Sequence, residues 1–322
     1  MTNSVLVTGI GGNVGQGILR NIRAAFPQLR LVGTDIRDVT AGHHFCDAAH
    51  RVPYCYDAGF EPCITAICRE EQIELIIPGT DYEVVYLGEL AARLPMILGS
   101  PSDVARVFVD KLMTFERFEK RGIPFAASCL PSEFAGQFDR VVVKPREGRG
   151  SRGIHIDPPD PCLFDETFLV QERIVGREIT TAFYVTRGGE LHGHITFERE
   201  LSAGTTERCG VSTAFDALVG PLVHAIHASF DLRGPCNVQS IVTADGDIVP
   251  FEVNCRYSGT NSLRSQFGFE DVRWGIQEYL LDAPPSGWTL RPGAAVRVLM
   301  DIIYPGRTLG EITAGSDDSY LF

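Results

Sequence analysis

The chain has 322 residues, of which 44% are hydrophobic and 22% are charged, and its formal net charge is −12 at pH 7. This length predicts two or three domains with room for a sizeable core, and the composition is that of an ordinary soluble globular protein. The acidic balance argues against nucleic acid as a partner, because binding to a phosphate backbone depends on clusters of Lys and Arg.

Features of membrane and secreted proteins are missing from the sequence. No apolar run reaches the roughly 18 residues that a membrane-spanning helix requires, and the chain opens directly on the strand-like segment Ser4–Thr8. The nine cysteines are scattered and contain no Cys-x-x-Cys pair, which favours reduced thiols over a disulfide framework. We therefore expect a cytoplasmic protein that has no membrane partner.

The first hundred residues alternate apolar strands with amphipathic helices. A strand at residues 5–8 runs into a glycine turn with Gly9, Gly12 and Gly15, a helix follows, and the second strand ends in Asp35. This alternation predicts a small parallel sheet with helices on both faces. The glycine spacing is that of the short-chain and epimerase type of dinucleotide turn, so an NAD(P)-dependent oxidoreductase or epimerase stays open as an alternative.

A different pattern begins near residue 110. A helix predicted over residues 110–122 ends at a glycine, and a buried strand at 140–145 then carries Lys144. A glycine-rich loop at 147–153 and a return strand at 154–156 complete a hairpin that can close over phosphates, with loop N–H groups and the lysine charge as donors. A mobile hairpin tip that binds no phosphate is the alternative interpretation of this loop.

The next segment, residues 168–180, predicts an edge strand that leads into a turn. Its backbone groups can pair with an adenine, and Glu178 beyond the turn can accept hydrogen bonds from ribose hydroxyls. A solvated surface acid is the alternative interpretation of Glu178.

Two later strands, at residues 237–242 and 248–254, predict a hairpin turned at residues 245–246. Period-two alternation puts Glu252 and Asn254 on one face with Arg256 continuing it, and the hairpin brings Gln239 level with them. Oxygen ligands of this kind suit Mg²⁺, which takes one or two carboxylates together with substrate phosphates. The polar face of an edge hairpin would also have this pattern.

Taken in order, these segments resemble the successive motifs of the ATP-grasp superfamily, and they most resemble a single unit of the carbamoyl-phosphate synthetase large subunit. The resemblance covers residues 1 to about 285. It implies an α/β fold in which a Rossmann-like parallel sheet, the pre-ATP-grasp domain of residues 1–100, precedes an α+β ATP-grasp part. That part would comprise a lid subdomain with the glycine-rich loop, residues 101–176, and a C-terminal subdomain with the metal strand, residues 177–322.

The resemblance also implies which residues hold ATP. Positions that match the ATP-binding residues of the family are Lys111, Lys144, Gly150, Ser151, Gln171, Glu172, Arg173, Ile174 and Glu178. The two lysines and the loop residues would contact phosphates, the segment from 171 to 174 would border the adenine, and Glu178 would bind the ribose.

The remaining site residues follow from the same comparison and from charge. Gln239, Glu252 and Asn254 match the Mg²⁺ positions, while Arg256 and Lys144 match the catalytic cations that act on the transferred phosphoryl group. Substrate contacts are expected from Arg199, Arg264 and Gly259, because an arginine can meet a carboxylate with two parallel hydrogen bonds. For each arginine, a surface ion pair is the alternative interpretation. The neutral Gln239 leaves open whether one or two metal ions bind.

The implied function is an ATP- and Mg²⁺-dependent carboxylate–amine ligase that forms an amide through an acyl phosphate and releases ADP and phosphate. Its partners would be a small-molecule carboxylate and an amine, which the sequence does not identify, and a homodimer stays open. Against an oxidoreductase or epimerase stands the missing Tyr-x-x-x-Lys motif near residues 130–160. A non-catalytic ATP-binding module would be expected to lack a lysine or a metal position, and none is lost.

Overall fold

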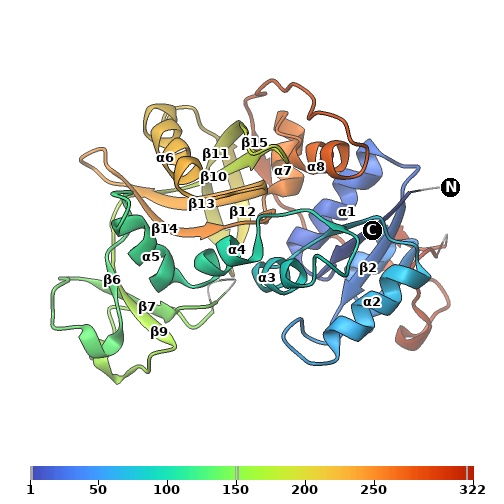
Figure 1. Cartoon of the computed structure of the whole chain (residues 1–322), viewed down its shortest axis with the longest axis horizontal. Helices are drawn as coiled ribbons and strands as arrows, with labels where there is room; N and C mark the ends of the chain where they lie inside the picture. The colour runs from blue at the N-terminus through green and yellow to red at the C-terminus, as the bar shows by residue number, and fades with distance from the viewer. Residues whose placement is uncertain (1–2, 149, 151, 317) are drawn as a thin grey trace.

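The computed structural model describes residues 3–148, 150, 152–316 and 318–322. In these residues the strands form a five-stranded, a four-stranded and a six-stranded sheet and a short two-stranded ribbon. Figure 1 shows the five-stranded sheet at the N-terminal end of the molecule and the other two large sheets at the opposite end. None of the helices in the described ranges is long and apolar enough to cross a membrane.

The N-terminal sheet is parallel, as the sequence predicts. Its strands, in spatial order, are β3 (Ala48–Arg51), β2 (Arg30–Asp35), β1 (Ser4–Thr8), β4 (Leu75–Ile77) and β5 (Met96–Ile97). Its crossover helices are α1 (Asn13–Ala25), α2 (Phe60–Glu70) and α3 (Asp81–Glu89).

Two different parts of the chain cover the faces of this sheet. On one face, Phe60, Ile64 and Ile67 of α2 pack against the strands. On the other face, α1 packs together with α8 (Asp271–Tyr279), a helix from the far end of the sequence. The C-terminal part of the chain therefore completes the core of the N-terminal sheet, and the two ends of the molecule cannot part without exposing apolar surface.

The four-stranded sheet, here named the lid, lies within residues 101–176, the predicted lid subdomain. Its strands are β6 (Ser128–Cys129), β9 (Phe168–Glu172), β7 (Val141–Pro145) and β8 (His155–Ile156), in that spatial order. The prediction of an edge strand at residue 168 is wrong, because β9 lies between β6 and β7 and pairs antiparallel with both. Helices α4 (Ser102–Val109) and α5 (Lys111–Glu119) precede the lid, and Asp110 caps α5 by accepting from two backbone N–H groups.

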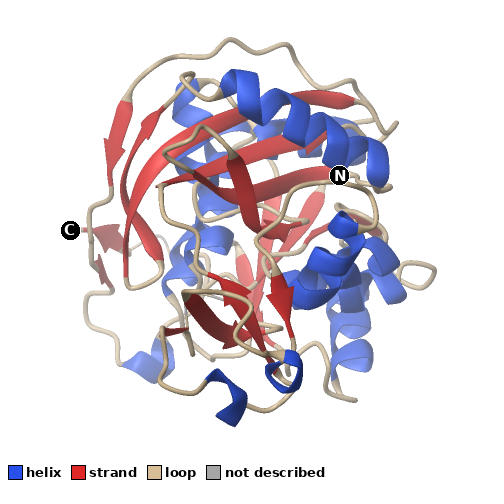
Figure 2. Ribbon diagram, turned by 90° about the vertical axis from the view of Figure 1, so that its left-hand side faces the viewer, coloured by secondary structure: helices blue, strands red, loops and turns tan. Residues whose placement is uncertain are grey.

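The six-stranded sheet is antiparallel wherever its pairs are described. Its strands, in spatial order, are β14 (Ile248–Asn254), β13 (Gly234–Val242), β10 (Arg177–Val185), β11 (Leu191–Ser202), β12 (Thr205–Val211) and β15 (Ala294–Val296). The predicted hairpin 237–254 is confirmed, and β14 is an edge strand. Figure 2 shows the long strands of this sheet side by side.

Shorter elements complete the chain. Helix α6 (Asp216–Ser229) packs on one face of the six-stranded sheet, α7 (Asn261–Arg264) follows β14, and β16 (Ile302–Ile303) pairs with β17 (Tyr320–Leu321). The lid strands end at residue 172 and the six-stranded sheet begins at 177, while the domain boundaries at 100 and 176 stay predictions.

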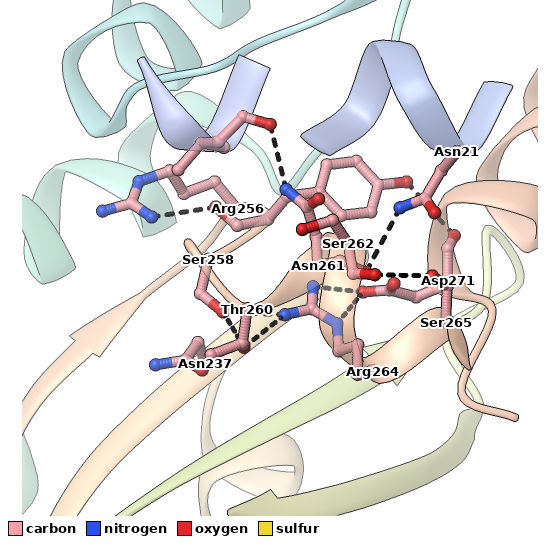
Figure 3. Close-up of polar contacts among 12 residues, drawn as sticks. Asn21, Asn237, Arg256, Ser258, Thr260, Asn261, Ser262, Arg264, Ser265 and Asp271 are labelled. Atoms are coloured by element: carbon pink, nitrogen blue, oxygen red, sulfur yellow. Dashed lines mark hydrogen bonds and ion pairs between the residues drawn. The ribbon is translucent and has the colours of Figure 1, made fainter. Parts of the chain in front are cut away.

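A close contact joins α1 to the segment that follows β14. The side-chain amide of Asn261 donates to the carbonyl of Val14 at 3.0 Å, and Asn21 donates to the carbonyl of Asn261 at 3.2 Å (Figure 3). A β-carbon on Gly17 would lie 2.0 Å from Oδ1 of Asn261, far inside contact distance. Glycine is therefore required at position 17 by the approach of the two segments.

We expect Gly17→Ala to destabilise the protein by about 1–3 kcal/mol, because the added methyl group forces α1 away from Asn261. In an open helix the same change would stabilise by up to about 1 kcal/mol. The measurement is urea unfolding of both single variants and of Gly17→Ala with Asn261→Ala. In the Asn261→Ala background the cost should shrink by at least about 1 kcal/mol; an equal cost in both backgrounds would place the clash elsewhere.

Candidate active site

The β13–β14 hairpin brings the three predicted metal-site residues together. Gln239 lies opposite Glu252, and Asn237 lies opposite Asn254. Residues directly opposite in an antiparallel pair point to one face of the sheet. Asn254 donates its side-chain N–H to Oε1 of Glu252 at 3.1 Å, which leaves the amide oxygen of Asn254 and the second carboxylate oxygen of Glu252 available to a cation.

Both predicted phosphate lysines are buried next to this hairpin. Lys144 on β7 donates to the backbone carbonyl of Phe251 at 3.3 Å and lies 5.4 Å from the centre of the Phe251 ring. Lys111, the first residue of α5, donates to the carbonyls of Gly148 at 3.2 Å and Arg146 at 3.4 Å. Each lysine is only 6% exposed. Lys144 therefore joins β7 to β14 through the hydrogen bond from its side-chain nitrogen to the Phe251 carbonyl.

The charges of these residues act on one another. The pKa of Lys144 is lowered to about 7, chiefly by burial; Glu252 opposes the change and Lys111 contributes to it. Burial alone would raise the pKa of Glu252, but Lys111, Lys144, Asn254 and Arg256 outweigh it and the pKa is lowered. Two buried ammonium groups thus share one carboxylate. Such a site has a surplus of positive charge that an anion can neutralise.

The glycine-rich loop lies against a turn of the larger sheet. Gly150 has φ +65°, in the left-handed region that favours glycine, and a β-carbon on Gly204 would lie 2.6 Å from the Gly150 carbonyl oxygen. Gly204 belongs to the turn between β11 and β12. Ser151, which was predicted to contact phosphate, lies outside the described residues, so its role stays a prediction.

The predicted adenine segment connects β9 to β10. Gln171 is buried and donates to Oγ of Ser128 at 3.0 Å, so its side chain belongs to the interior of the lid. Glu172 is exposed, and Arg173 forms an ion pair with Asp157 at 2.7 Å. A contact of Gln171, Glu172, Arg173 and Ile174 with adenine would involve backbone groups and stays a prediction.

Arg199 links two predicted ligand residues. Its guanidinium donates to Oε1 of Glu178 at 2.8 and 3.1 Å and also to Oε1 of Gln239. The side chain of Arg199 is 10% exposed. The amide oxygen of Gln239 therefore already accepts a hydrogen bond from a cation, whose positive charge opposes a metal ion at the same oxygen.

Arg256 reaches across to the N-terminal sheet. Its Nε and Nη2 lie 2.7 and 2.6 Å from Oδ2 of Asp81, the first residue of α3, and both side chains are mostly buried. The sequence analysis did not single out Asp81. The available signal was its position just after β4, since ligand-binding groups of parallel sheets gather at the carboxyl ends of the strands.

Arg264 is not a substrate residue. It is fully buried and donates to the carboxylate of Asp271 at 3.0 Å and to the hydroxyls of Ser258 at 2.7 Å and Thr260 at 3.1 Å (Figure 3). The prediction for Arg264 is wrong, because partners inside the protein occupy its guanidinium. Gly259, in the same segment, packs against Asn13 at the start of α1, and a substrate contact there stays a prediction.

The glycine turn is occupied by protein groups. Asp35 accepts a hydrogen bond from the N–H of Gly11 at 2.8 Å and another from the N–H of Arg37 at 3.1 Å. A β-carbon on Gly11 would lie 2.9 Å from both Asp35 and Thr40. The N–H of Gly11 therefore points at a carboxylate, which is an unfavourable neighbour for the pyrophosphate of a dinucleotide.

Comparison with known families agrees with this arrangement. Residues 108–260 match the ATP-grasp domain family, and residues 5–97 match the family described as the PylC-like N-terminal domain. The chain therefore contains an ATP-grasp domain, preceded by a domain of the PylC-like N-terminal family. A comparison with curated protein sequences finds no match.

Solved structures share the fold over nearly the whole chain. An N5-carboxyaminoimidazole ribonucleotide synthetase in complex with ADP has a TM-score of 0.75 and 13% identity, covering 100% of this chain and 92% of that one. The corresponding ATP-complexed synthase of Aspergillus clavatus gives 0.73 and 17%, covering 94% and 81%. The biotin carboxylase domain of Hydrogenobacter thermophilus 2-oxoglutarate carboxylase gives 0.68 and 16%, covering 86% and 69%. The expected two-part fold is confirmed.

ATP binding should take up a proton at Lys144. Above pH 7 the lysine is mostly neutral in the free protein, whereas nearby phosphates would favour its charged form. ATP affinity should therefore fall as pH rises above 7, by up to about tenfold per pH unit for one proton. Titration calorimetry near pH 8 in two buffers with different ionisation enthalpies measures the uptake.

The chain offers a matched control for this prediction. Of its three lysines only Lys120 is exposed, at the end of α5. Lys120→Met should leave the proton uptake unchanged, whereas Lys144→Met should weaken binding and remove its pH dependence. The same enthalpy in both buffers for the natural protein would mean that Lys144 is already charged before ATP binds.

Proposed function

We propose that the protein is an ATP- and Mg²⁺-dependent ligase that joins a small-molecule carboxylate to an amine, with ADP and phosphate as the other products. The observation that carries this proposal is the convergence of Lys111, Lys144 and Arg256 on the single carboxylate of Glu252. The match of residues 108–260 to the ATP-grasp domain family supports the proposal, as do fold relatives that were solved with ATP or ADP.

The donor set suits Mg²⁺. Glu252 offers a carboxylate oxygen and Asn254 an amide oxygen from the same face of β14, and these two ligands would be completed by phosphate oxygens and water. When bound, the ion would neutralise charge on the phosphate oxygens during phosphoryl transfer. Gln239, held by Arg199, is the weakest of the three predicted ligands, which favours a site built on Glu252 and Asn254.

The chain's own residues would bind and orient ATP. Lys144 and Lys111 reach the phosphates from the lid side, and Gly150 belongs to the loop that would cover them. Arg256 approaches from the opposite side, where Asp81 fixes its guanidinium. Cations held in place before the reaction stabilise the charge of the transferred phosphoryl group without rearranging in the transition state.

The reaction would take place in two steps. An oxygen of the substrate carboxylate attacks the γ-phosphorus, and the bond to the β,γ-bridging oxygen breaks, giving an acyl phosphate and ADP. The amine then attacks the acyl carbon and phosphate leaves, while the amine loses a proton. A lid that excludes water would protect the acyl phosphate from hydrolysis between these steps.

Two other functions receive less support. A nicotinamide nucleotide would have to displace Asp35 from the N–H of Gly11. A non-catalytic ATP-binding module has no need for a charged pair such as Arg256 and Asp81 beside the metal strand. A nicotinamide nucleotide at the glycine turn would also leave the two buried lysines next to Glu252 without a role.

We expect Glu252→Gln to lower turnover by at least about a hundredfold, a loss of roughly 3 kcal/mol of transition-state stabilisation. The variant keeps the shape of the side chain but removes the one carboxylate on this face of β14. ATP-dependent ADP release and the melting temperature are the measurements, and Glu74→Gln, on an exposed residue of the N-terminal sheet region, is the control. Near-normal turnover would move the metal site away from β14.

The acyl phosphate should be trappable. With ATP, Mg²⁺ and an acid found by screening for ADP release, hydroxylamine in place of the natural amine should give a hydroxamate. Lys144→Ala should lose most of this product, because a cation next to the transferred phosphoryl group contributes on the order of 3 kcal/mol. Formation of AMP and pyrophosphate with no hydroxamate would indicate adenylation and would remove Lys144 and Arg256 from their proposed roles.

A further inference from the structure

Arg297 is a partly buried cation without an acidic partner. Among the described residues, every other arginine that is not exposed forms an ion pair with Asp or Glu, whereas Arg297 forms none. The remaining arginines that lack an ion pair are all exposed. Partial burial of a guanidinium is costly unless its charge is balanced, so Arg297 is the exception that calls for a ligand.

The guanidinium of Arg297 is held firmly by neutral groups. Nε donates to the carbonyl of Thr206 at 2.9 Å, and Nη2 donates to the carbonyl of Gly259 at 2.8 Å. Its backbone N–H also bonds to the carbonyl of Glu207 at 2.7 Å. Two of the five N–H donors are used in this way, and the three that remain on Nη1 and Nη2 suit a carboxylate that binds end-on.

Both carbonyl partners belong to walls of the candidate active site. Gly259 follows Arg256 by three residues and packs against Asn13 at the beginning of α1. Thr206 lies two residues after Gly204, whose turn meets the glycine-rich loop at Gly150. Arg297 therefore connects the segment after β14, through Gly259, to strand β12, through Thr206.

A second positive charge lies near Arg297. Burial and the neighbouring Arg20 of α1 both lower the pKa of Arg297. Arg20 is exposed and has no ion-pair partner among the described residues. Asn13 and Arg20 are seven residues apart in α1, so they lie on the same face of the helix. Two guanidinium groups without a carboxylate between them produce a local positive potential that attracts an anion.

We infer that Arg297 is the binding residue for the carboxylate of the acid substrate, with Arg20 adding to the attraction and Asn13 forming the opposite wall. This inference rests on the proposed ligase function and identifies where its acid binds. The proposed carboxylate site lies on the side of β14 that faces α1, whereas Lys111 and Lys144 approach β14 from the lid side. Substrate and ATP phosphates would thus be held by separate sets of cations.

The test uses malonate, a small dicarboxylate, as the probe in the presence of saturating Mg²⁺ and ADP, which occupy the phosphate lysines. Binding is followed by NMR titration of ¹³C-labelled malonate to the full-length chain. We expect saturable binding to the natural protein and at least about tenfold weaker binding to Arg297→Gln, which can still donate a hydrogen bond but carries no charge. Arg297→Lys, which keeps the charge, should retain more affinity than Arg297→Gln.

Controls separate this site from general effects of charge. Arg291→Gln removes an exposed arginine six residues away and should bind malonate like the natural protein. Equal malonate binding by Arg297→Gln and the natural protein, or no malonate binding by the natural protein, would overturn the inference. Inorganic phosphate in a parallel titration should compete poorly; binding of phosphate alone, lost in Arg297→Gln, would overturn the assignment to a carboxylate.

Failure of this inference is distinguishable from failure of the proposed function. ADP binding is measured first and independently, and Arg297→Gln should bind ADP with unchanged affinity. If ADP binds and malonate does not, only the role of Arg297 falls. Loss of ADP binding by the natural protein would instead contradict the ligase proposal itself. Once the acid substrate is known, Arg297→Gln should raise its KM while the KM for ATP stays the same.

Discussion

The arrangement of the molecule around its site depends on two ammonium groups buried beside one carboxylate. Lys144 comes from the lid and Lys111 from the helix before it, while Glu252 lies on the edge strand of the larger sheet. Each lysine is held by backbone carbonyls, so its position is set by main-chain geometry. Asp81 already pairs with Arg256, but the single carboxylate of Glu252 cannot balance both lysines when both are charged. The site therefore favours an anion where ATP phosphates are proposed to bind.

A second constraint is the attachment of the N-terminal sheet to the ATP-grasp part. Helices α1 and α8 share one apolar core, Gly17 permits the close approach of Asn261, and Asp81 fixes Arg256. These contacts join the walls of the site into one body on that side. The lid is different, because it meets the rest of the site through single bonds such as that of Lys144, which suits a part that must admit ATP.

The glycine turn before α1 has a packing role in this protein. Its spacing indicates a dinucleotide site, but Asp35 already accepts the N–H of Gly11. The helix that follows the turn instead presents Asn13 to Gly259 and, two turns further along the same face, Arg20 towards Arg297. The turn therefore positions α1 beside the region where the acid substrate is proposed to bind. This role of the glycine turn depends on close packing and requires no bound nucleotide.

Much of the fold was predictable because its signals are local. Alternation of apolar residues indicates the parallel sheet, and the hairpin that aligns Gln239 with Glu252 follows from strand period and a two-residue turn. Other features were predicted wrongly for the same reason. The strand at 168–172 has the sequence pattern of an edge strand but lies between β6 and β7. The residues of one segment do not indicate which distant strands it will pair with.

The sequence by itself determined the order of motifs and which residues of the hairpin and lid carry lysine, carboxylate and amide groups. Only the tertiary structure decided how the charges are paired. Arg199 and Gln239 are 40 residues apart, and Arg256 and Asp81 are 175 apart. Arg264 looked available and is fully buried against Asp271, whereas Arg297 drew no attention and is the partly buried arginine without an acid. The charge of an arginine is a property of the residue, but its balance depends on which carboxylates the fold brings within a few ångströms.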